Sequence, residues 1–132
     1  MKKILLAAVV LLMSVASGSA LAEWVWVASS DKVTAYADPS SMRKKLNIVK
    51  LWTLFDYKEE GVLTDGSTFL SVMRETEFNC KDNFQRMTGY SIHAGRLGKG
   101  KTLESGNEPQ EWKPVSRSAM ALQMKKFACK AG

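Results

Sequence analysis

The chain has 132 residues and a formal net charge of +6. A chain of this length forms one domain that buries about two-thirds of its surface. Beyond residue 22 no segment is apolar enough to cross a bilayer, which needs about 20 apolar residues, so a membrane-spanning mature protein is excluded.

The first 22 residues have the pattern of a secretory signal peptide. Lys2 and Lys3 supply a positive start, residues 4–13 form an apolar run, and Ala20, Leu21 and Ala22 form a small-residue cleavage site. The apolar run is too short for an uncleaved membrane anchor. We therefore expect residues 1–22 to be removed and residues 23–132 to form a single domain in the periplasm or outside the cell. No cysteine follows the cut, so lipid attachment there is not expected.

The two cysteines, Cys80 and Cys129, both lie in the expected mature chain. An oxidising compartment favours a disulfide between them. Closing a loop of about 50 residues stabilises a fold by roughly 4 kcal/mol. The alternative is a reactive or metal-binding pair, but two Cys and the single His93 lack the clustered spacing of a zinc site.

Without Lys2 and Lys3, the 19 basic residues become 17, against 13 acidic residues, and the net charge is +4. This excess fits attraction to an anionic surface or an acidic protein. Nucleic acid is not expected as a partner in an exported compartment.

Strand patterns fill the first half of the mature chain. Residues 24–27 alternate tryptophan with valine, and residues 33–37 form a second short strand. Residues 38–41, with Pro39, are expected to end that strand. A solvated turn is then predicted at Arg43, Lys44 and Lys45.

Longer strands follow. Residues 48–57 form an apolar strand, Asp65 and Gly66 predict a hairpin turn, and residues 68–80 return as a strand. Residues 83–93 form a further strand. The pattern predicts consecutive antiparallel strands.

The C-terminal part contains a glycine-rich segment and a helix. Residues 95–108 are expected to be a flexible basic loop, followed by a short strand at 112–115. Ser116 or Ser118 can cap a helix that runs to about Cys129. The sequence therefore predicts an α+β fold, with one helix packed on a face of the sheet.

One motif matches a nucleotide-binding loop by letter. Gly95, Gly100, Lys101 and Thr102 fit G-x-x-x-x-G-K-[ST]. Such a loop needs a helix directly after it to bind phosphate, whereas Gly106 and Pro109 follow here. We interpret the segment as a glycine-rich loop and expect no cofactor.

No catalytic residues are assigned. Glu75 and Glu77 share one face of a strand, about 6.5–7 Å apart, near the spacing of inverting glycosidases. A solvated pair of carboxylates is the simpler interpretation. His93 is the only imidazole and is expected to lie at the surface or to line a turn. We expect the protein not to be an enzyme.

The candidate partner-binding residues are Arg96, Lys99 and Lys101 in the glycine-rich segment. They combine positive charge with expected backbone freedom, which suits contact with an anionic or protein partner.

Short motifs along the mature chain resemble the surface-adhesin protein E family of exported bacterial proteins. They are an N-terminal tryptophan strand, the Tyr36 to Ser41 run, Leu51 with Trp52, the strand carrying Glu75, Glu77 and Cys80, Gly98 with Gly100, Trp112, and Cys129. The resemblance implies an antiparallel sheet of about six strands, one C-terminal helix, a Cys80–Cys129 bridge and a homodimer. It also implies adhesion to host matrix proteins such as vitronectin and laminin.

Two functions follow as hypotheses. The first is a non-enzymatic exported binding module, adhesin-like, that contacts a host-matrix or anionic envelope partner. The alternative is a periplasmic inhibitor or envelope-stress protein that acts on an enzyme such as a lysozyme. The missing lipid-attachment cysteine favours a soluble periplasmic domain over surface display, because it departs from the pattern of the named adhesin.

Overall fold

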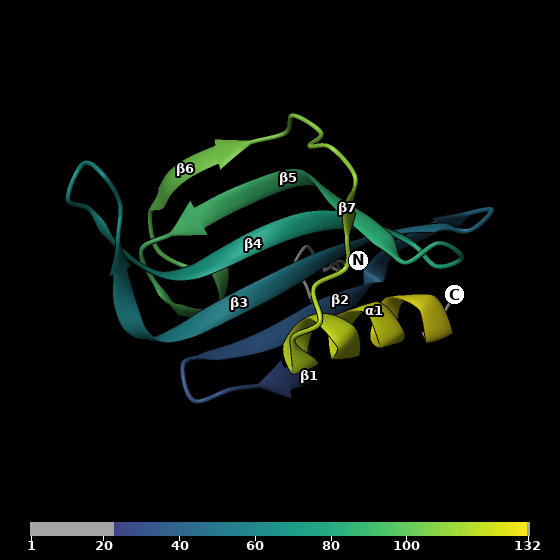
Figure 1. The fold of residues 1–132 in the computed structure, drawn as a ribbon. Helices are drawn as coiled ribbons and strands as arrows, with labels where there is room; N and C mark the ends of the chain where they lie inside the picture. The colour runs from purple at the N-terminus through teal and green to yellow at the C-terminus, as the bar shows by residue number, and fades with distance from the viewer. Residues whose placement is uncertain (1–22, 132) are drawn as a thin grey trace, which may run out of the picture.

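A computed structural model describes residues 23–131 as an antiparallel sheet with one helix against one of its faces (Figure 1). The strand order is β1-β2-β3-β4-β5-β6, and β7 pairs with β5. This confirms the predicted α+β class, while the predicted signal peptide lies outside the described residues. The elements are β1 (Val25–Ser29), β2 (Val33–Lys45), β3 (Ile48–Val62), β4 (Thr68–Asn79), β5 (Phe84–His93), the 3-10 turn η1 (Arg96–Gly98), β6 (Thr102–Gly106), β7 (Lys113–Pro114) and α1 (Ala119–Ala131).

The core lies between α1 and the sheet. Of the two predicted caps, Ser118 is the one that caps the helix, because its Oγ accepts a hydrogen bond from the Ala121 amide at 3.1 Å. Ala35 and Ala37 on β2 are fully buried, and their small side chains leave room for larger apolar groups of the helix. Alternate residues of the strands and one stripe of α1 fill the space: Val49, Leu51, Phe78, Met124 and Ala128.

The predicted disulfide between Cys80 and Cys129 is present. It joins the end of β4 to the last turns of α1, with 5.6 Å between the two Cα atoms. Next to it, the Cys80 amide donates to the Asn47 carbonyl at 2.9 Å. The bridge therefore holds the C-terminal end of α1 beside the tips of two hairpins, as Figure 1 shows.

The prediction that residues 38–41 end the second strand is wrong. Strand β2 continues to Lys45 through an irregularity between Asp38 and Arg43. There the Ser41 hydroxyl donates to the Asp38 carbonyl at 2.7 Å and accepts from the Trp52 amide at 2.9 Å. A side chain thus replaces the ladder bonds that Pro39 interrupts, so the strand resumes beyond the proline.

The expected flexible loop at 95–108 contains a strand, β6, which pairs with β5. The Tyr90 hydroxyl donates to Glu104 Oε2 at 2.6 Å. A Cβ atom on Gly106 would lie 2.8 Å from the Tyr90 ring, so glycine allows the ring to pack over the strand. Polar, glycine-rich residues hide the strand from sequence patterns, because β6 is an edge strand with little buried surface.

Within residues 23–131, no helix has both the length and the apolar character that crossing a bilayer requires.

Candidate binding surface

The segment that contains the three predicted binding residues is folded onto the sheet face opposite α1. Ser71, fully buried on β4, donates to the Gly95 carbonyl at 2.6 Å and accepts from the Gly98 amide at 2.9 Å. Leu97 donates its amide to Asp56 Oδ1 at 2.8 Å. These bonds fasten residues 95–98 to the central strands.

Arg96 is part of this attachment. Its guanidinium donates to the Tyr57 carbonyl at 2.7 Å and to the Lys58 carbonyl at 3.2 Å, and it forms an ion pair with Asp56 at 3.3 Å. Lys99 and Lys101 are exposed. The structure thus gives Arg96 a positioning role within the fold, while the assignment of Arg96, Lys99 and Lys101 to partner binding stays a prediction.

The amides of this segment are used within the protein. The Gly95 amide bonds to the Lys99 carbonyl at 3.0 Å, and the Lys99 amide bonds to the Arg96 carbonyl at 3.0 Å. Strand β6 follows the turn instead of a helix. The letters of the nucleotide-binding motif therefore occur without the converging amides and helix N-terminus that hold phosphate.

A stronger concentration of charge lies at the end of the molecule that carries the disulfide. Three segments meet there: the β2–β3 turn, the β4–β5 turn and the C-terminal turns of α1 (Figure 1). Within residues 43–47, 79–83 and 125–130 the only acidic residue is Asp82. The seven basic residues of these segments, which we call the basic end, are Arg43, Lys44, Lys45, Lys81, Lys125, Lys126 and Lys130.

An exposed leucine lies at the tip of the basic end. Leu46 is 85% exposed, the most exposed of the large apolar side chains of residues 23–131. Its φ is 56°, in the left-handed region that bulky residues avoid. A leucine in this position gives the fold neither burial nor a relaxed backbone.

The opposite end of the molecule carries charges of both signs. Asp31, Glu59, Glu60 and Asp65 lie in or next to the β1–β2 and β3–β4 turns, and Lys32 and Lys58 lie among them. The basic end has seven basic residues and one acidic residue, while the remainder of residues 23–132 has 10 basic and 12 acidic residues, so the positive charge is concentrated at the basic end.

Sequence reasoning missed the basic end because it treated residues 43–45 as an isolated solvated turn. The cysteine pairing did contain part of this information: once Cys80 and Cys129 are paired, their neighbours Lys81 and Lys130 must lie close together. The proximity of the β2–β3 turn, however, depends on strand register.

Glu75 and Glu77 are both engaged in internal contacts. Glu75 Oε1 accepts from the Thr88 hydroxyl at 2.9 Å. Glu77 pairs with Arg86 at 2.7 Å, and Arg86 in turn stacks on Trp112, 4.8 Å from the ring centroid. These contacts give both carboxylates a structural role within the sheet. Residues 23–131 contain no group of three or more His, Cys, Asp or Glu residues arranged to hold a metal ion.

His93 is buried, so the predicted surface position is wrong. Its Nε2 lies 2.7 Å from Ser91 Oγ and its Nδ1 lies 3.4 Å from Thr102 Oγ1. Burial penalises the charged imidazolium and lowers the pKa of His93 below its usual 6.5.

The lowered pKa of His93 predicts a loss of stability in mild acid. Below about pH 6.5 the unfolded chain binds a proton that the folded chain resists, so the free energy of unfolding falls as the pH falls. The fall stops below the folded-state pKa. Urea denaturation between pH 7.5 and pH 5 should show this slope, and His93→Gln should reduce it. An unchanged slope in the variant contradicts the assignment to His93.

Comparisons with known proteins agree with this architecture. Residues 24–130 match the model of a family described as surface-adhesin protein E. Two crystal forms of Haemophilus influenzae protein E are similar in fold. The first has a TM-score of 0.62 and 12% identity, covering 80% of this chain and 84% of that chain. Crystal form II has a TM-score of 0.61 and 10% identity, covering 80% and 92%. A search of curated proteins finds no match.

Proposed function

The chain belongs to the surface-adhesin protein E family, and on that premise we propose that it is an exported, adhesin-like binding protein that attaches to an anionic surface through its basic end. One observation carries the proposal. Seven basic residues and the exposed Leu46 lie in three segments that meet at the disulfide end, and only one acidic residue accompanies them.

Electrostatics supports an anionic partner. Each Lys or Arg held near a negatively charged surface contributes about 1 kcal/mol of attraction within a Debye length. The other end, where acidic and basic residues are mixed, gains no comparable attraction. This difference favours an orientation in which the basic end faces the partner.

Leu46 adds an apolar contact to this attraction. Burying a leucine side chain is worth about 1.5–3 kcal/mol. An apolar tip flanked by Arg43 and Lys45 can enter the boundary between charged head groups and acyl chains, with the cations left at the head groups. We propose an anionic envelope or host-cell surface as the partner on this basis. Vitronectin and laminin, implied by the family, are further proposed ligands.

The test is binding of the mature chain, residues 23–132, to immobilised anionic phospholipid vesicles and to neutral vesicles, measured over a range of salt. We expect retention on anionic vesicles only, weakening as salt rises. Leu46→Ser should lower the affinity about tenfold because the apolar contact is lost. Val62→Ser is the matched control, since Val62 is 68% exposed at the opposite end, where β3 ends, and should leave the affinity unchanged.

The same assay is repeated with three other immobilised ligands: lipopolysaccharide, vitronectin and laminin. Equal retention on neutral and anionic vesicles, or equal losses in the two serine variants, contradicts the proposed surface. Failure to bind all of these ligands at low salt contradicts attachment itself. The homodimer implied by the family stays a prediction that the sedimentation of the same preparation tests.

A further inference from the structure

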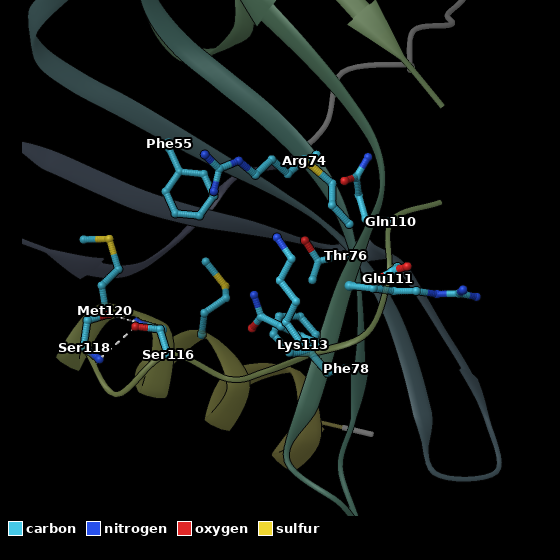
Figure 2. A pocket seen from close by; sticks show the side chains of 15 residues that line it. Phe55, Arg74, Thr76, Phe78, Gln110, Glu111, Lys113, Ser116, Ser118 and Met120 are labelled. Atoms are coloured by element: carbon cyan, nitrogen blue, oxygen red, sulfur yellow. Dashed lines mark hydrogen bonds between the residues drawn. The ribbon is translucent and has the colours of Figure 1, made fainter. Parts of the chain in front are cut away.

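A pocket of about 470 Å³ opens on the helix side of the sheet. It lies between β3, β4 and β5, the first turns of α1, and the residues that lead from β6 to the helix. Figure 2 shows Phe55 and Arg74 on one side, Met120 and Ser118 on another, and Lys113 extending into the space between them. Its volume falls within the range of about 300–1,000 Å³ found for ligand pockets.

Part of the wall is apolar and adaptable. Phe55 and Phe78 line the pocket from the sheet, and Met87, Met120 and Met124 line it from β5 and the helix. Methionine side chains are unbranched and polarisable, so they adjust to ligands of different shape. Such walls fit a flexible aliphatic chain.

Two cations at the pocket have no carboxylate partner among the residues that the structure describes. Within residues 23–131 the side chain of Arg74 contacts the Phe55 ring, at 4.8 Å from the centroid, and forms no ion pair. Lys113 also lines the pocket and makes no ion pair in the same part of the chain. Glu111 is the one acidic residue of the lining.

The third cation of the lining, Arg86, is already neutralised by Glu77 at 2.7 Å. The N-terminus of α1 adds partial positive charge, and no acidic residue in the first helical turn offsets it. The charges that remain uncompensated in the pocket are therefore positive on balance.

We propose that this pocket binds an amphiphilic anion, a linear aliphatic chain with a carboxylate or phosphate head. The head is held by Arg74 and Lys113, and the chain lies against the phenylalanine and methionine side chains. A guanidinium can donate two parallel hydrogen bonds to either head group. The site lies on a different face from the segment with Arg96 and is independent of the basic end.

A free fatty acid and a single-chain phospholipid share this chemistry. Dodecanoate and dodecyl phosphate, below the concentrations at which they form micelles, are the probes for the two sources. Dodecyltrimethylammonium and dodecanol carry the same chain with a cationic or neutral head. Titration calorimetry should give binding of the two anions and at least tenfold weaker binding of the cation and the alcohol.

The position of the ligand is read from methionine methyl resonances. The signals of Met87, Met120 and Met124 should shift on addition of dodecanoate. Met73, which lies on the opposite face beside Gly98, should not shift.

Variants test the two parts of the site separately. Arg74→Gln should weaken dodecanoate binding about tenfold because a charge-assisted contact is lost, while Lys99→Gln removes the same charge elsewhere and should have no effect. Ala121→Leu reduces the volume of the pocket and should weaken all the probes. Its matched control is Ala119→Leu at a neighbouring exposed position of the helix.

Three outcomes overturn the proposal: no binding of either anion, equal binding of dodecyltrimethylammonium, or wild-type affinity in both Arg74→Gln and Ala121→Leu. A preference for dodecanoate identifies a fatty acid as the ligand class, and a preference for dodecyl phosphate identifies a phospholipid.

Discussion

Replacing Cys80 and Cys129 together by alanine will lower the free energy of unfolding by about 4 kcal/mol. The bridge joins residues that are 49 positions apart in sequence. Without it, the conformational entropy of the unfolded chain rises, because a long loop is no longer closed. A domain of this size is stable by only about 5–15 kcal/mol. Urea denaturation followed by tryptophan fluorescence measures the change.

Reduction provides the control for the disulfide. Dithiothreitol should lower the stability of the wild type by a similar amount and leave the double variant unchanged. A loss below about 1 kcal/mol would show that α1 is held by core packing alone, through Met124 and Ala128.

Neutralising three lysines of the basic end will reduce affinity for anionic vesicles about 10²-fold. The variant is Lys45→Gln, Lys81→Gln and Lys126→Gln, one residue from each of the three segments, all exposed. At about 1 kcal/mol for each charge, the summed loss is about 3 kcal/mol. Vesicle retention at fixed salt gives the affinity, and the slope of affinity against salt should fall as well.

The matched control is Lys32→Gln, Lys99→Gln and Lys101→Gln, which removes the same charge from exposed positions outside the basic end. We expect a small loss, from the lower net charge alone. A large loss here with a small loss at the basic end would instead support binding through the predicted residues Lys99 and Lys101. Equal losses would mean that attraction follows net charge without a localised site.

Individual residues show why the candidate site was only partly predictable. Arg96 is basic and lies in a glycine-rich segment, which suggested an available contact. Its place in the fold is decided by the carbonyls of Tyr57 and Lys58, about 40 residues away in sequence. Leu46, the most informative apolar residue, looks in sequence like an ordinary turn-flanking leucine, because exposure is not a local property.

The sequence by itself determined the alternation of the strands, the apolar stripe of the helix, a serine cap at either Ser116 or Ser118, and the pairing of the two cysteines. The strand and helix patterns are local, and two cysteines allow only one disulfide, so residue type and spacing are sufficient to predict these features. Tertiary structure alone decided that β2 continues past Pro39, that residues 102–106 pair as an edge strand, and that three basic segments meet at one end. Each of these depends on a partner distant in the chain, since hydrogen-bond register and helix docking are set by the whole sheet and not by the segment itself.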